Sequence, residues 1–191
     1  MNDDIDKKLC EKYPKIFRDR NASPQTTCMC WGIAVGPGWY NILNNACSLI
    51  QHHINWTRTR RLQALVQNRA IKYAMNGNNT YLRRLYSTQD GSMTIWQEKE
   101  YNRLLSNLQF DVVPDACPQV VAVQVKEKFG SLRFYYNGGD TQTSGIISMA
   151  EAMSGTTCED CGNVGKRQSN GWIRVLCDPC HNSNKEEQLV D

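Results

Sequence analysis

The sequence has no long apolar run and no acidic residue between positions 57 and 89, and it carries no standard phosphate-binding fingerprint. A membrane-spanning helix needs about 20 consecutive apolar residues, so a spanning segment is excluded. The glycine-containing stretches 36–38 and 137–140 match neither the P-loop nor the dinucleotide-binding pattern. We therefore expect tight turns there, with backbone N–H groups at a helix start as a weaker candidate for holding a phosphate.

The sequence also shows no recognisable group of catalytic residues. The chain shows no nucleophile with a neighbouring base and orienting group, and no close pair of carboxylates for acid–base catalysis. The adjacent His52 and His53 point to different faces of a helix, so they form a poor metal-binding pair. We therefore predict that the protein is not an enzyme, although a site assembled from distant residues would leave no such pattern.

The chain does have nine cysteines, and four of them form two matched pairs near the C-terminus. Cys158 and Cys161 form one Cys-x-x-Cys pair, and Cys177 and Cys180 form the second after fifteen intervening residues. Each pair lets two sulfurs from one tight turn reach the same ion. The spacing predicts a zinc ribbon with one structural Zn²⁺ per chain, because four thiolates leave no coordination position open for water.

Two other interpretations of these pairs are weaker. Paired disulfides suit a secreted chain, but no signal peptide is recognisable, and a redox-active Cys-x-x-Cys motif normally occurs singly beside a βαβ unit. His181 directly follows Cys180 and could replace it as the fourth ligand. Reduced thiols and a bound metal indicate a cytoplasmic protein.

Four other cysteines favour buried free thiols over a second metal site. Cys-x-Cys is poor zinc spacing, and free cysteine is among the most frequently buried residue types. The predicted buried thiols are Cys28, Cys30, Cys47 and Cys117.

The net charge of +3 hides an uneven distribution, because residues 57–89 carry seven Lys and Arg and no acid while the rest of the chain sums to −4. At about 100° per residue, four of these cations share one narrow sector of a helix. They are Arg58, Arg61, Arg69 and Lys72. Such a patch neutralises phosphates in nucleic-acid-binding proteins. The competing interpretation is a solvated helix whose cations pair with acids elsewhere in the fold.

Hydrophobic periodicity predicts an α+β fold with N-terminal helices and a small antiparallel sheet. Helices are expected at residues 1–20 (interrupted by Pro14), at 39–55, in the basic segment up to the turn at 76–79, at 94–108 and at 144–153. The apolar run 28–35 is expected to form a strand. Alternation from Val121 to Val125 and from Leu132 to Tyr136 predicts a β-hairpin.

The simplest organisation is one α+β domain followed by the ribbon. We expect the α+β domain at residues 1–155, with the basic helical segment 57–89 inside it. The zinc ribbon follows at 156–185, and an acidic tail follows at 186–191.

The hairpin is the strongest candidate for a contact surface. If its apolar positions face the core, Arg133 and Tyr135 face outward, with Lys126 and Lys128 nearby. Arginine and tyrosine on an exposed sheet suit contacts to phosphates and stacking on bases. The competing interpretation is a hairpin with an ordinary solvated face. With the pair beside the first glycine turn, the predicted ligand-binding residues are Lys126, Lys128, Arg133, Tyr135, Trp39 and Tyr40.

Several short motifs occur in a fixed order along the chain. They are EKYPKIF (11–17), CMCWG (28–32), GWYNIL (38–43), KEKFGSLRFY (126–135), MAEAMS (149–154) and the two cysteine pairs. Together they resemble a family of small tailed-phage and prophage proteins that have a C-terminal zinc ribbon and no established reaction. The resemblance covers most of the chain, and residues 57–89 look like a segment that only some relatives carry.

The resemblance implies an accessory protein of the host-cell cytoplasm that acts by binding. The leading hypothesis is a non-catalytic counter-defence protein that sequesters a nucleotide-derived, phosphate-bearing ligand. The alternatives are a DNA- or RNA-binding zinc-ribbon protein and an inhibitor that binds a host protein complex. No membrane partner is expected.

Overall fold

The computed structural model describes residues 3–168 and 172–187 of the chain. Contacts divide the chain into two compact units. We call Met1–Ile54 with Cys117–Asp191 the core unit, and Asn55–Ala116 the inserted unit. The cysteine-rich ribbon belongs to the core unit by this division, while the predicted domain boundaries stay a prediction. Most of the predicted acidic tail lies outside the described residues.

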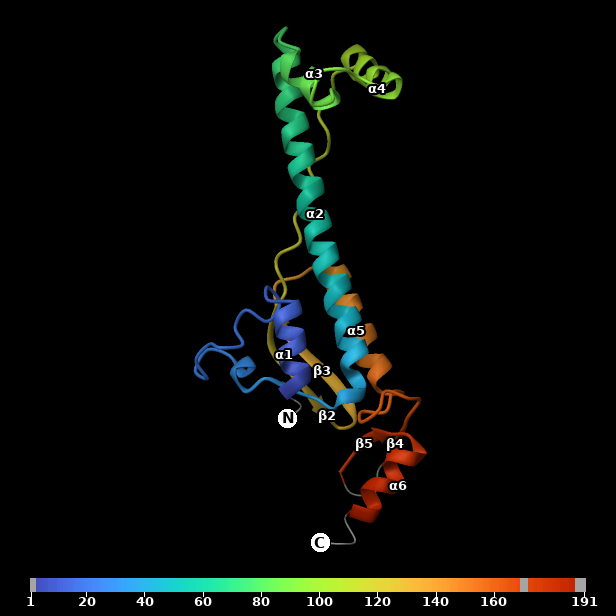
Figure 1. Ribbon diagram of the computed structural model, residues 1–191. Helices are drawn as coiled ribbons and strands as arrows, with labels where there is room; N and C mark the ends of the chain where they lie inside the picture. Colours follow the sequence, from blue (N-terminus) through green and yellow to red (C-terminus); the bar gives the residue numbers. More distant parts are fainter. Residues whose placement is uncertain (1–2, 169–171, 188–191) are drawn as a thin grey trace. The chain divides into compact units, whose positions relative to one another are not determined.

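The core unit is built on a three-stranded sheet, which confirms the α+β class (Figure 1). Its strands are β1 (Ile33–Ala34), β2 (Val121–Lys128) and β3 (Ser131–Asn137). β1 pairs with β2 in parallel, and β2 pairs with β3 in antiparallel orientation. The predicted hairpin is confirmed, since Val125 lies opposite Phe134 and Lys126 lies opposite Arg133.

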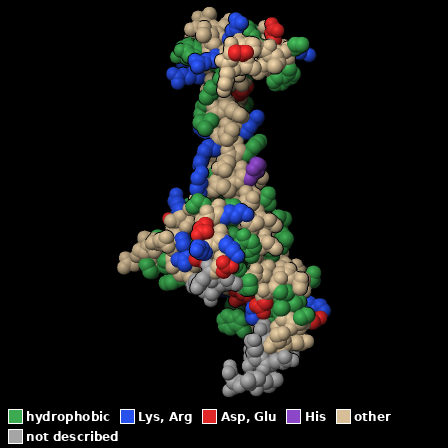
Figure 2. Space-filling model, in the orientation of Figure 1, with side chains coloured by type: hydrophobic (Ala, Val, Ile, Leu, Met, Phe, Trp, Pro, Cys, Tyr) green, Lys and Arg blue, Asp and Glu red, His purple; other side chains and the backbone are tan. Residues whose placement is uncertain are grey.

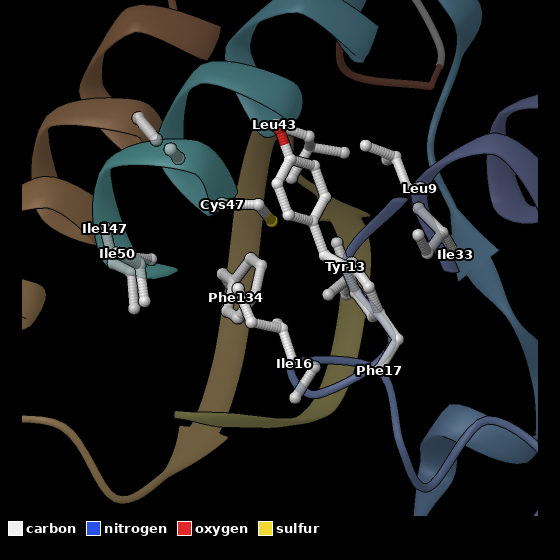
Figure 3. Close-up of a cluster of buried hydrophobic side chains, with 14 of the residues drawn as sticks. Leu9, Tyr13, Ile16, Phe17, Ile33, Leu43, Cys47, Ile50, Phe134 and Ile147 are labelled. Atoms are coloured by element: carbon white, nitrogen blue, oxygen red, sulfur yellow. The ribbon is translucent and has the colours of Figure 1, made fainter. Parts of the chain in front are cut away.

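Three helices share the hydrophobic core with this sheet. They are α1 (Asp3–Lys12), α2 (Tyr40–Met75) and α5 (Thr141–Ser154). Leu9 of α1, Leu43 of α2 and Ile147 of α5 belong to one buried cluster with Phe134 of β3 (Figure 3). Apolar side chains at helical and strand periods therefore converge on one core, as their spacing in the sequence predicts for these elements.

Helix α5 also covers the outer edge of β3. The backbone N–H of Leu132 donates to Ser154 Oγ at 2.8 Å, and that of Phe134 donates to Glu151 Oε1 at 2.9 Å. An uncovered strand edge is a template for pairing with another chain. The two side chains of α5 therefore satisfy donors that would otherwise be open to a further strand.

The strand predicted at 28–35 is mostly wrong. A 3-10 turn occupies Cys28–Trp31, because the Thr27 side chain accepts a hydrogen bond from the Met29 N–H. Gly32 ends this turn at a φ of 82°, and only β1 of the predicted strand is extended.

The predicted helix end near residue 55 is also wrong, because α2 runs without interruption from Tyr40 to Met75. No Gly or Pro occurs in that range, so nothing in the chain forces a break. The predicted end at 76–79 is confirmed. Gly77 has a φ of 84°, and the Asn78 N–H donates to Tyr73 O at 3.0 Å, as in a Schellman motif.

The inserted unit adds two short helices to its part of α2. They are α3 (Thr80–Tyr86) and α4 (Ile95–Ser106). Its small buried cluster comprises Ala70, Ile71, Ala74 and Leu82. The helix predicted at 94–108 is confirmed and begins with a capping box of Thr94 and Gln97. The side chain of Trp96 on this helix is exposed.

Candidate functional site

The structure brings the four predicted metal ligands together. The sulfur atoms of Cys158, Cys161, Cys177 and Cys180 all lie within 4.8 Å of one another, and the Sγ atoms of Cys161 and Cys177 are 3.5 Å apart. A tetrahedral thiolate site with Zn–S bonds of about 2.3 Å puts its sulfurs about 3.8 Å apart. This four-cysteine cluster can therefore hold one metal ion, and it includes Cys180 rather than His181.

Backbone hydrogen bonds shape the first cysteine turn. The Cys158 N–H donates to Asn163 O at 2.7 Å, and the Gly162 N–H donates back to Cys158 O at 2.9 Å. Gly162 has a φ of 82°, a conformation that side-chain-bearing residues seldom adopt. The turn therefore depends on the glycine that follows the second cysteine.

A short hairpin delivers the second pair of ligands. Its strands are β4 (Lys166–Gln168) and β5 (Arg174–Leu176), and α6 (Asp178–Glu187) begins one residue after Cys177. Cys180 therefore lies on the first turn of α6, and the His181 N–H donates to Cys177 O at 2.9 Å.

Backbone N–H groups also lower the pKa of the Cys158 thiol. Burial opposes the charged form of Cys158, but N–H groups of Cys177, Cys161 and Asp160 point at its sulfur and lower its pKa to about 7. A thiolate is the form that binds metal. The backbone around Cys158 therefore favours the form of this thiol that binds metal.

The first glycine turn serves the ribbon rather than a phosphate. The Gly38 N–H donates to Glu159 O at 2.7 Å, and the Gly36 N–H donates to Glu159 Oε1 at 3.1 Å. Glu159 is buried and accepts a hydrogen bond from Arg174 Nε at 3.2 Å. Both turn N–H groups are used internally, which corrects the idea that they hold an anion.

Trp39 belongs to the same junction. Its side chain is fully buried, and its indole N–H donates to Thr157 O at 2.8 Å. Trp39 therefore offers no surface to a ligand and joins the start of α2 to the ribbon. The neighbouring Tyr40 is half-buried and packs against the core. Trp39 is therefore not a ligand-binding residue, which corrects that part of the prediction.

The structure brings the hairpin residues together on one face. Lys126 and Arg133 lie opposite each other in the β2–β3 register, and Lys126 Nζ is 5.9 Å from the centre of the Tyr135 ring. Tyr135 is exposed, and Arg133 is half-exposed with its Nη1 donating to Leu132 O. We call Lys126, Lys128, Arg133 and Tyr135 the hairpin face.

Phe129 at the hairpin tip was not predicted as part of this surface. Phe129 and Gly130 both have positive φ, at 53° and 75°, as a two-residue type I′ turn requires. The Phe129 ring is 62% exposed, and Lys128 Nζ lies 5.6 Å from its centre. The sequence feature that could have indicated this exposed turn is the Phe-Gly pair between the two predicted strands.

The four cations of the basic helix all lie on α2. Arg58, Arg69 and Lys72 are exposed, whereas Arg61 is half-buried and donates to Pro114 O at 2.9 Å. Figure 2 shows Lys and Arg side chains exposed along this helix. Among the described residues of the inserted unit, the ion pair recorded joins Arg103 to Glu100, and no acid of this unit pairs with a cation of segment 57–89. Acids of the inserted unit therefore do not neutralise these cations.

The remaining predicted thiols differ in burial. Cys47 and Cys117 are buried as predicted, but Cys28 and Cys30 are only half-buried, which corrects that part of the prediction. Burial and the neighbouring Asp140 carboxylate raise the pKa of Cys117 to about 11.

Comparisons with known proteins add no relative. No protein-family model matches the chain, and no curated protein or solved structure matches it. Among the helices that the structure describes, none combines the length and apolar character needed to cross a membrane. The resemblance to phage proteins thus stays an expectation.

Proposed function

We propose that the protein is a non-catalytic binder of a nucleotide-derived, phosphate-bearing ligand, and that the hairpin face is its contact surface. The observation that carries this proposal is the register of β2 and β3, which places Lys126 opposite Arg133 and beside the exposed ring of Tyr135. An exposed aromatic ring beside a lysine, with an arginine opposite that lysine, has what a nucleotide needs, namely a surface for the base and charges for the phosphate.

The expected affinity follows from ordinary magnitudes. Stacking of a base on an exposed ring contributes about 1–3 kcal/mol. A hydrogen bond to a charged group contributes about 1.5–3 kcal/mol. Loss of the Arg133 guanidinium should therefore weaken binding by about 10- to 100-fold, because 1.4 kcal/mol corresponds to a factor of ten.

Binding alone is sufficient for the biological role that we propose. A phage protein that holds a nucleotide signal of the host lowers the free concentration of that signal without any reaction. The resemblance to phage accessory proteins supports this counter-defence role, and the hairpin chemistry supports the class of ligand.

We also propose that the metal of the four-cysteine cluster is Zn²⁺ and that its role is structural. Four thiolates in tetrahedral arrangement favour zinc over harder ions, and they leave no open position for a substrate. The hydrogen bonds of Gly36, Gly38 and Trp39 to the first cysteine turn support a role in holding the ribbon on the core unit.

Calorimetric titration with a panel of mono-, cyclic and oligonucleotides tests the ligand proposal. We expect saturable, stoichiometric binding of at least one compound, and weaker binding by Arg133→Ala and Tyr135→Ala. Lys8→Ala is the matched control, because Lys8 is an exposed cation of the core unit already paired with Asp4 at 2.6 Å. Absence of binding across the panel, or equal binding by Arg133→Ala, contradicts the proposal.

A second candidate function is DNA or RNA binding by the inserted unit. The specific observation in its favour is that, among the described residues of the inserted unit, no acid pairs with the cations of segment 57–89. Each phosphate contact contributes about 0.9 to the slope of log affinity against log salt concentration. The double variant Arg58→Ala/Arg69→Ala should reduce that slope by about 2.

Arg103→Ala is the control for this experiment, because the Arg103 guanidinium already pairs with Glu100 at 2.9 Å. Affinity that does not change with salt, or a slope that the double variant leaves unchanged, contradicts nucleic-acid binding through α2.

A further inference from the structure

A second cluster of metal-binding side chains lies in the core unit, apart from the four-cysteine cluster. His53 Nε2, Cys117 Sγ and an Asp140 carboxylate oxygen all lie within 4.8 Å of one another. His53 Nε2 is 2.7 Å from Asp140 Oδ2. The three residues come from α2, from the segment before β2, and from the position just before α5.

The backbone holds this cluster in place. Gly138 and Gly139 both have a φ of 78°, and a Cβ added to Gly138 would lie 2.2 Å from Gln119 O. The Gly139 N–H donates to Pro118 O at 3.2 Å. The turn before Asp140 therefore lies directly against the segment that follows Cys117, and only glycine permits that approach.

The two oxygens of the Asp140 carboxylate contact different partners. Its Oδ1 accepts the Thr143 N–H at 3.0 Å as the N-cap of α5, which leaves Oδ2 for His53. The hydrogen bond from the backbone fixes the orientation of the carboxylate, so its second oxygen is held toward His53. The His53 side chain is only 9% exposed, whereas that of Asp140 is 36% exposed, so the cluster opens to solvent on the Asp140 side.

We propose that His53, Cys117 and Asp140 form a second metal site that takes Zn²⁺. Imidazole nitrogen, thiolate sulfur and carboxylate oxygen are the three ligand types that zinc accepts. On binding, the Cys117 thiol loses its proton to the solvent, and His53 coordinates through Nε2 as a neutral imidazole that carries its proton on Nδ1. Three protein ligands leave the fourth position for water, unlike the closed four-cysteine cluster.

The position of the site indicates its role. Ile54 is the last residue of the core unit before the inserted unit, and Cys117 is the first after it. A metal bound to His53 and Cys117 therefore ties together the two points at which the chain leaves and re-enters the core unit. Through Asp140, the same ion also fixes the start of α5.

Metal analysis of the full chain, loaded with excess Zn²⁺ and then freed of unbound ion, tests the site. Native and denaturing mass spectrometry should count two zinc ions per chain in the wild type. Cys117→Ser and Asp140→Asn should each retain one. Asp140→Asn is the safer variant, because asparagine also serves as an N-cap and so preserves α5.

Cys28→Ser is the matched control, since Cys28 is a half-buried free thiol outside both clusters. It should retain two ions. Substitution with Co²⁺ gives a second readout, because Cys117→Ser should remove one thiolate-to-metal charge-transfer contribution and leave that of the four-cysteine cluster. One zinc per wild-type chain under excess metal overturns the proposal. Retention of a second zinc ion by both Cys117→Ser and Asp140→Asn also overturns the proposal.

Discussion

Substitution of Gly38 by alanine should loosen the ribbon from the core unit. A Cβ at this position would lie 2.1 Å from Cys158 O, 2.4 Å from the Gly162 N and 2.8 Å from Glu159 O. All three are backbone atoms of the first cysteine turn, so no side chain can rotate away. The turn or the start of α2 must instead move by about 1 Å to admit the methyl group.

The expected cost has two parts. Overpacking of this kind costs about 1–3 kcal/mol. The displacement also weakens two hydrogen bonds, from the Gly38 N–H and the Trp39 indole, which contribute about 0.5–1.5 kcal/mol each. Gly38→Ala should therefore lower the free energy of unfolding by about 2–6 kcal/mol, or by about 1–3 M urea in midpoint for an m value near 2 kcal/mol/M.

Tryptophan fluorescence during urea unfolding is the assay. Trp39 is fully buried, whereas the other four tryptophans are exposed, so the spectral shift on unfolding comes mainly from the environment of Trp39. Gly145→Ala is the matched control, because a Cβ at that helical position meets nothing within 4 Å. The control should be neutral or stabilise by up to about 1 kcal/mol. A Gly38→Ala midpoint equal to that of the wild type would refute the reasoning.

Three further predictions concern other parts of the chain. Ser154→Ala removes the acceptor of the Leu132 N–H and should cost about 1–3 kcal/mol in urea unfolding, while Ser144→Ala, on the exposed side of α5, should cost much less. Cys161→Ser should abolish metal binding by the four-cysteine cluster and unfold the ribbon, since structural zinc supplies about 10–16 kcal/mol in comparable small sites, and proteolysis within 156–185 would report it. Leu82→Ala should destabilise the inserted unit by about 2–5 kcal/mol, visible as faster hydrogen exchange in α3 and α4; unchanged exchange would contradict the packing of Leu82.

Local patterns in the sequence were sufficient to predict the hairpin and the ribbon. Alternation of apolar and polar residues places Phe134 inward and Tyr135 outward whatever packs against the sheet. The two Cys-x-x-Cys pairs predict a common ligand set because each pair is one short turn. The same reasoning misjudged 28–35, where the Thr27 side chain captures a backbone donor and favours a 3-10 turn over a strand.

The sequence therefore determined the four cysteines of the cluster, the α+β class and the two faces of the hairpin, because these depend on residues close together in the chain. Only the tertiary structure decided that Trp39 holds the ribbon and that His53 meets Asp140. Those contacts join residues that are 118 and 87 positions apart in the chain, and no local period or spacing encodes them. They exist because turns at Gly38 and Gly138 let distant backbone segments approach within hydrogen-bonding distance.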